Sequence, residues 1–225
     1  MEDNKIWSVT LILTMVAGYC DSITFVAADK IFSAHVTGNF IVFAYQLIQG
    51  GDGDAWIKLL TFPVFIISVI IGGMVAARSV NRYRLLLMEG MLLVAGGIIS
   101  ELFIRTPGLI WETYLVVMMV VFAMGLQNAF GKLYAKETYG PTTMMTGNVT
   151  QASLDLGNAI SSYFKDLVSV QGLKHQCITI GGFLAGCLAG ALMAKSFGLT
   201  VVILPGAGFI VCYFSTHRNV PENAA

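Results

Sequence analysis

Six long apolar runs constrain the fold of this chain more than any other feature of its sequence. They cover approximately residues 6–26, 59–77, 85–103, 110–130, 177–194 and 197–214. A helix needs about 20 predominantly apolar residues to cross the hydrocarbon core of a bilayer. Only 12% of the 225 residues are charged, whereas charged residues make up about a quarter of an ordinary soluble domain. The sequence therefore predicts an all-α, polytopic membrane protein.

The chain also contains an internal repeat. The motif Thr37-Gly38-Asn39 returns as Thr146-Gly147-Asn148, and two weaker echoes occur in the same order. In these echoes Gly18 and Asp21 correspond to Gly125 and Asn128, and residues 73–79 correspond to residues 190–196. Three ordered echoes indicate one structural unit present twice, and such a repeat decides the architecture.

Two shorter runs, residues 37–48 and 144–160, begin with the Thr-Gly-Asn motifs and either cross the membrane or re-enter it. Cytoplasmic loops carry an excess of Lys and Arg. If neither run crosses, nine Lys and Arg residues lie inside and four outside, against seven and six if both cross. The first arrangement fits better and gives three crossings per half. We therefore predict two inverted three-helix repeats, residues 1–106 and 107–225, each with an additional short broken or re-entrant helix.

The same count places both termini on the cytoplasmic side. Residues 105–108, Arg-Thr-Pro-Gly, are the expected hinge between the halves, because Pro and Gly interrupt helices. The acidic, glycine-rich turn at residues 50–54 is expected to face outward.

The two Thr-Gly-Asn motifs are the first candidates for a solute site. A Thr N-cap accepts a hydrogen bond from the first turn, and free N–H groups at a helix start attract polar or anionic groups. In inverted-repeat transporters such helix ends meet near the midplane and hold the substrate. This hypothesis assigns substrate binding to Thr37, Gly38, Asn39, Thr146, Gly147 and Asn148. The alternative is that Thr and Asn only cap two helices.

Asp21 lies deep in the first apolar run, where an unpartnered charge is costly, so it is a candidate for proton coupling. The alternative is a hydrated carboxylate near the membrane interface. Its repeat mate is the neutral Asn128, which follows Gln127. These two amides and Tyr19 are expected to complete the polar ring around the solute.

Two further residues are candidates for proton transfer. His35 precedes the first Thr-Gly-Asn motif, and a histidine beside a carboxylate can relay protons; the alternative is a structural, hydrogen-bonded histidine. Asp155 and its repeat mate Gln46 occupy polar positions of apolar runs, which indicates that both face the protein interior.

Other polar and small residues are expected to be structural. Glu89 is expected to pair with Arg82 or Arg84 near the inner surface. A small-residue face at Gly182, Gly186 and Gly190 suits close helix packing, either within one chain or between two, which leaves a homodimer open. The four cysteines show no metal-ligand spacing, and no metal or cofactor is expected. Balanced charge gives no support for nucleic-acid binding.

The paired motifs resemble those of the YoaK family, a group of small bacterial membrane proteins defined as a domain of unknown function. The resemblance extends from about Trp7 to Phe214 and includes Gly18, Asp21, Thr37, Gly38, Asn39, Gly125, Gln127, Asn128, Thr146, Gly147 and Asn148. It implies about six membrane helices and a bacterial cytoplasmic (inner) membrane. It implies no substrate.

These features favour a secondary transporter for a small polar or anionic solute, with proton coupling through Asp21 as the sharper hypothesis. Nothing in the sequence indicates an enzyme. A passive channel with the same polar ring is one alternative. A non-transporting membrane assembly or receptor-like factor is another.

Overall fold

The structure is a computed structural model that describes residues 2–50, 54–103 and 110–217. All regular structure in these ranges is helical, as predicted, and no strand occurs in them. The elements are α1 (Glu2–Ala27), α2 (Gly38–Ile48), α3 (Ile57–Arg78), α4 (Arg84–Phe103), α5 (Ile110–Leu133), η1 (Ala135–Glu137), α6 (Met145–Ser161), α7 (Leu167–Phe197), η2 (Gly198–Val202) and α8 (Ile203–His217). The expected hinge at residues 105–108 and the centre of the turn at residues 50–54 lie outside the described residues.

Five stretches of the described chain are long and apolar enough to cross a membrane. They are Lys5–Ala27, Ile57–Arg78, Arg84–Phe103, Trp111–Leu133 and Leu167–Phe214, and the last contains α7, η2 and α8. Helices therefore occupy all six predicted apolar runs. The chain has the helices of a multi-pass membrane protein.

Helix α7 begins ten residues earlier than the predicted run at residue 177. Polar residues in its first turns, among them Lys174 and Gln176, lower the local hydropathy and hide the helix from a search for apolar runs. The start is marked instead by Asp166, whose side chain accepts a hydrogen bond from the backbone N–H of Val168 and so caps the helix.

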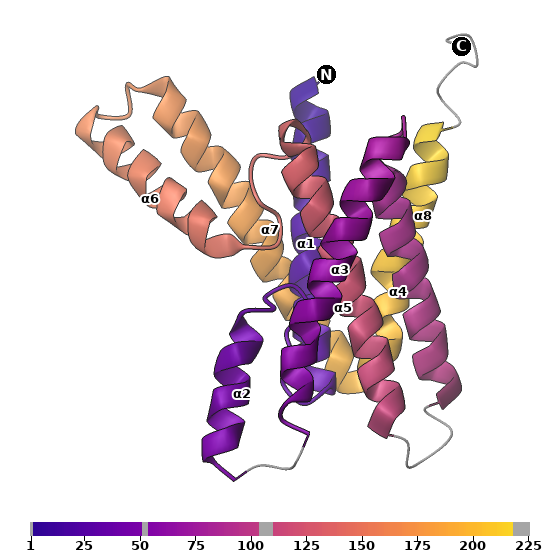
Figure 1. Cartoon of the computed structure of the whole chain (residues 1–225). Helices are drawn as coiled ribbons and strands as arrows, with labels where there is room; N and C mark the ends of the chain where they lie inside the picture. The colour runs from indigo at the N-terminus through magenta and orange to yellow at the C-terminus, as the bar shows by residue number, and fades with distance from the viewer. Residues whose placement is uncertain (1, 51–53, 104–109, 218–225) are drawn as a thin grey trace.

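The two short helices begin at the Thr-Gly-Asn motifs, as predicted. Helix α2 starts at Gly38 after a non-helical segment, residues 28–37, which we call the first loop. Helix α6 starts at Met145 after residues 138–144, the second loop. In Figure 1, α2 lies beside the lower end of the bundle and α6 beside the upper end. The N-terminal end of α1 and the C-terminal end of α8 lie at the same end of the bundle (Figure 1).

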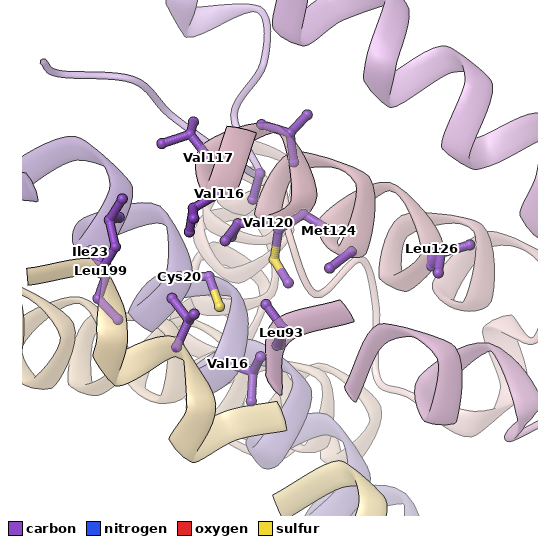
Figure 2. Packing of buried hydrophobic residues seen from close by; sticks show 14 of the residues in the cluster. Val16, Cys20, Ile23, Leu93, Val116, Val117, Val120, Met124, Leu126 and Leu199 are labelled. Atoms are coloured by element: carbon purple, nitrogen blue, oxygen red, sulfur yellow. The ribbon is translucent and has the colours of Figure 1, made fainter. Parts of the chain in front are cut away.

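The bundle core is a continuous cluster of buried apolar side chains. Figure 2 shows members of this cluster on α1 (Val16, Cys20 and Ile23), α4 (Leu93), α5 (Val116, Val117 and Val120) and η2 (Leu199). Of the five apolar stretches, α5 is the most enclosed, with 61% of its apolar window buried, against 17% for α3. Helix α5 is therefore the central helix, and the outer faces of the others are left for lipid.

The predicted glycine face packs within the chain, on α1. A Cβ at Gly182, Gly186 or Gly190 would collide with Thr14, Met15 or Tyr19, respectively. The backbones of α1 and α7 therefore approach so closely that only glycine fits at these positions.

The two glycines that correspond in the sequence repeat, Gly18 and Gly125, make similar close contacts. On α1, Gly18 faces the backbone of Phe183 and Cys187 in α7. Its repeat mate on α5, Gly125, faces Phe65 and Ser68 in α3. Each half thus packs its first long helix against the helix that follows the short helix of the other half.

We predict that Gly186→Ala destabilises the protein by roughly 1–3 kcal/mol, because the added methyl group forces α1 and α7 apart. The control is Gly181→Ala in the same helix, where an added Cβ meets nothing within 4 Å. The measurement is thermal unfolding of the purified protein in detergent. Equal unfolding midpoints for the two variants would contradict the close packing described here.

Candidate functional site

Asp21 fixes the first loop against α1. Its side chain is in the protein interior, with only 4% of the residue exposed. One carboxylate oxygen, Oδ1, accepts hydrogen bonds from the backbone N–H groups of Ser33 and Ala34, each at 2.7 Å. Bonds of this kind stabilise a carboxylate and satisfy loop amides that have no helical partner. The burial argues against a hydrated carboxylate at the membrane interface.

The second oxygen of Asp21 pairs with His35. The Oδ2 atom lies 2.5 Å from Nδ1 of the imidazole, whose side chain is 34% exposed. The ring lies between Phe32 and Phe183, with centroid distances of 6.3 and 5.6 Å. A contact this short requires a proton between the two atoms. Both oxygens of Asp21 are therefore bonded, Oδ2 to the imidazole and Oδ1 to the loop.

A cavity of about 690 Å³ lies beside this pair. It is lined by residues of α1, the first loop, α2 and α7. Four of the predicted site residues share it, namely Asp21, His35, Thr37 and Gly38. Its walls also carry the rings of Phe25, Phe32 and Phe183, which the sequence analysis did not identify. The cavity is thus an apolar pocket with one titratable pair.

Asn39 clamps the first loop from the other side and does not line the cavity. Its Oδ1 accepts from the backbone N–H of Phe32 at 2.8 Å. Its Nδ2 donates to the carbonyl of Phe32 at 2.8 Å and to Oγ1 of Thr61, in α3, at 2.9 Å. All the donors and acceptors of this fully buried amide except one lone pair are used, so its role is positional.

The second motif repeats this clamp. Asn148 donates to the carbonyl of Pro141 at 2.7 Å, seven residues earlier, just as Asn39 donates to Phe32 seven residues earlier. Asn128, the repeat mate of Asp21, donates to Oγ1 of Thr143 in the second loop at 2.5 Å. The second loop is therefore held by amides where the first is held by a carboxylate.

Gln127 connects the second loop to α1. Its Nε2 donates to the carbonyl of Leu13 at 2.9 Å and to Oγ1 of Thr142 at 3.0 Å. Tyr139 of the same loop donates its backbone N–H to Oγ1 of Thr10 at 3.0 Å. The second loop thus contacts α1 near its start, and the first loop contacts α1 near Asp21.

The remaining predicted residues lie elsewhere. Thr146 and Gly147 are exposed, and neither lines the cavity beside Asp21. Helix α2 packs against α3, and α6 packs against α7. The two Thr-Gly-Asn motifs therefore belong to two separate groups of residues and do not form one shared site.

Tyr19 and Asp155 also lie apart from the cavity. The hydroxyl of Tyr19 donates to the carbonyl of Val201 in η2 at 3.2 Å. Asp155 accepts from Nε2 of Gln151 at 2.9 Å and faces Gly172 of α7. The Tyr19 bond joins α1 to η2, whereas the Asp155 bond lies within α6, at its contact with α7.

The prediction that the two threonines cap their helices through their side chains is wrong. Thr37 occupies the N-cap position of α2 without a side-chain capping bond, and Thr146 lies inside α6, whose N-cap position is Met144. At α2 the backbone N–H groups of Gly38 and Asn39 already donate to the carbonyls of residues 35 and 36, as in a 3₁₀ turn. These groups are not available to an anion.

The predicted pairing of Glu89 with Arg82 or Arg84 is also wrong. Arg82 pairs with Glu137, at 2.6 Å, and the hydroxyl of Tyr83 donates to the same carboxylate at 2.8 Å. Glu89 is fully buried in α4, away from these charges. In the described parts of the chain, no three His, Cys, Asp or Glu side chains form a group that could hold a metal ion.

The sequence analysis missed the partners that hold the loops. Ser33 and Ala34 bond to Asp21 through backbone N–H groups, so their residue types do not reveal the contact. Thr142 and Thr143 could have been found, because they occupy the positions of Ser33 and Ala34 when the two motifs are aligned.

A protein-family model described as "Protein of unknown function (DUF1275)" matches residues 9–215. No curated protein and no solved structure matches the chain. The match confirms the coarser part of the resemblance, to a family without an assigned function, and the YoaK family itself stays a prediction.

We predict that Asn39→Ala loosens the first loop. Leaving the backbone groups of Phe32 unpaired costs roughly 1–3 kcal/mol, so amide exchange at residues 32–35 should accelerate about tenfold or more. Hydrogen-exchange mass spectrometry on the purified protein measures this directly. The control is Thr37→Val, which should leave exchange unchanged because the Thr37 side chain makes no capping bond. Equal acceleration in both variants would contradict the assigned roles.

Proposed function

The chain belongs to the DUF1275 family of proteins of unknown function, and we propose that it is a secondary transporter for a small polar or anionic solute. In this proposal transport is coupled to a proton through Asp21 and His35. The single observation that carries the proposal is a short carboxylate–imidazole pair lining a cavity of about 690 Å³ between apolar helices. Ionisable groups inside a membrane protein commonly mark proton and substrate pathways.

In this proposal the two oxygens of Asp21 have different roles. One holds the first loop and the other takes part in proton transfer. Oδ1 keeps the first loop in place through Ser33 and Ala34 in either protonation state of the pair. Oδ2 shares a proton with His35, and this is the bond that a solute can disturb. A solute that bonds to the imidazole shifts the shared proton toward or away from the carboxylate. Binding and proton occupancy are then linked.

Solute recognition would come from the side chains around the pair. The cavity volume lies within the range of pockets that hold small molecules, roughly 300–1,000 Å³. Because the first N–H groups of α2 are already bonded, the imidazolium of His35 would supply the positive charge for an anionic group. The hydroxyl of Thr37 would supply a neutral hydrogen bond, and the phenylalanine rings would enclose the apolar part of the solute.

Equivalent contacts in the two halves support the predicted inverted repeat, residues 1–106 and 107–225. Gly18 packs on α7 and its mate Gly125 packs on α3. Asn39 and Asn148 clamp their own loops over the same sequence distance. In inverted-repeat transporters, one repeat rocks against the other around a central site. Only the first half carries a carboxylate at the loop, which suits a single coupled proton.

The proposal includes the location predicted from the sequence. It places the chain in a bacterial cytoplasmic membrane with both termini on the cytoplasmic side. The N-terminal end of α1 and the C-terminal end of α8 lie at the same end of the bundle (Figure 1), which supports the second point.

We predict that Asp21→Asn abolishes proton-driven uptake without unfolding the protein. The asparagine Oδ1 can still accept from Ser33 and Ala34, as its repeat mate Asn128 shows that an amide is tolerated against a loop. Proteoliposomes with an inward proton gradient should accumulate a solute from a panel of labelled amino acids, sugars and carboxylates. Stimulation by the gradient should fall about tenfold or more in Asp21→Asn, which corresponds to ~1.4 kcal/mol.

The matched control is Asp155→Asn, which neutralises another buried carboxylate away from the cavity and should keep gradient-driven uptake. Full gradient-driven uptake by Asp21→Asn would exclude the assigned proton role. Flux that never saturates and ignores the gradient would favour the passive channel. Absence of flux together with a co-purifying protein would favour an assembly or receptor-like factor.

A further inference from the structure

Glu89 of α4 is a buried carboxyl group that the proposed transport site does not use. The residue is 0% exposed, and neither carboxyl oxygen has a hydrogen-bond partner. The other buried carboxyl groups in the described ranges are bonded, Asp21 to the first loop and Asp155 to Gln151. Glu89 is therefore the exception that needs a physical explanation.

The surroundings of Glu89 are apolar and tightly packed. Next to it on α4, Gly90 lies against Gly206 and Phe209 of α8, and a Cβ at Gly90 would come within 2.9 Å of the Gly206 carbonyl. Leu85, Leu86 and Leu93 share the buried face of α4. The residues next to Glu89 on α4 are therefore apolar and lie in close contact with α8.

No charged group reaches Glu89 from the elements packed around α4, which are α3, α5, η2 and α8. Their titratable residues with described side chains are Lys58 and Arg78 on α3, Glu112, Tyr114 and Lys132 on α5, and Cys212 and Tyr213 on α8. None of these side chains forms a hydrogen bond to Glu89. Arg84 and Glu101 of α4 itself are exposed, and the Cys20 thiol of α1 belongs to the same buried core.

We propose that Glu89 is a proton-binding site and stands as a neutral carboxylic acid at neutral pH. An ionised carboxylate without a partner or water costs far more in an apolar interior than a neutral acid does. The buried position of Glu89 therefore selects the protonated form. This inference does not depend on transport or on Asp21, since the groups and their surroundings are different.

A cavity gives this site a route to water. It has a volume of about 220 Å³ and lies between α1, α4 and α8, with Lys5, Tyr83 and Tyr213 among its lining residues. Leu86 and Phe209 also line it. Leu86 lies one helical turn before Glu89 on the same buried face, and Phe209 touches Gly90. A proton can thus reach Glu89 from the cavity once the Leu86 side chain moves.

Infrared spectroscopy tests the protonated state directly. The full-length protein in lipid nanodiscs at pH 7 should show the C=O stretching band of a protonated carboxylic acid. The band should be lost in Glu89→Gln and retained in Glu101→Gln, the control at an exposed position of the same helix. The unfolding midpoint of Glu89→Gln should equal that of the wild type, because the amide is neutral and of the same size. Absence of the wild-type band at pH 7, or its survival in Glu89→Gln, would overturn the proposal.

Labelling with dicyclohexylcarbodiimide tests the same state on the unmodified protein. The acid transfers its proton to one carbodiimide nitrogen as the carboxyl oxygen bonds to the central carbon. The resulting O-acylisourea rearranges by an oxygen-to-nitrogen acyl shift to a stable N-acylurea, and no atom leaves. Peptide mass spectrometry should find this adduct on Glu89. Labelling restricted to exposed carboxyl groups would count against the proposal, even if the Gln variant failed to fold.

A substitution in the cavity tests the route to water. Leu86→Ala should extend the cavity to Glu89, hydrate the carboxyl group and favour its ionisation. We expect the infrared band to disappear at a lower pH in Leu86→Ala than in the wild type. The control is Leu102→Ala on the exposed face of α4, which should leave the band unchanged. Identical titration of the band in wild type and Leu86→Ala would show that the cavity is not the route.

Discussion

The hydrogen bonds between Asp21 and the first loop are the interaction on which the rest of the site depends. A non-helical segment inside an apolar bundle exposes backbone N–H groups that lipid cannot satisfy. Asp21 accepts from two of these groups and Asn39 pairs with both backbone groups of Phe32, so the middle of the loop is held between α1 and α2. This in turn fixes the start of α2 and the walls of the cavity. Without the side chains of Asp21 and Asn39, the first loop would not hold His35 in position beside the cavity.

Both loops need hydrogen-bond partners inside the bundle, but the two halves supply different side chains. This difference is the basis of the proposed function. The second loop is held by Asn128 and Gln127, which are neutral and do not change with pH. The first loop is held by a carboxylate that also carries a histidine at 2.5 Å. In the second half, amides hold the loop by donating to Thr142 and Thr143, without a carboxylate. In the proposed function, the Asp21–His35 pair adds a proton-binding capacity that the loop itself does not need.

Much of the architecture follows from hydropathy and the repeated motif, because both act through local sequence. The long helices and the short ones beginning at the motifs were predictable for this reason. The interactions within the site were less so. Asp21 bonds to backbone amides, which carry no residue-type signal, and the Thr37 side chain proved unnecessary because a 3₁₀ turn already satisfies the first N–H groups of α2. Sequence proximity favoured pairing Glu89 with Arg82, yet Arg82 pairs with Glu137 of a distant segment.

Asp21 and Glu89 show the two ways in which this bundle accommodates a buried acid. Asp21 has backbone donors and a histidine around it, so a charge on its carboxylate is compensated. Glu89 has neither donors nor a cation, so the surrounding apolar side chains stabilise it only when it is neutral. In the two proposals, the first acid responds to a solute in the cavity that it lines, and the second responds to water that passes Leu86. If both proposals hold, one small bundle contains two separate proton sites, and each can be occupied without the other.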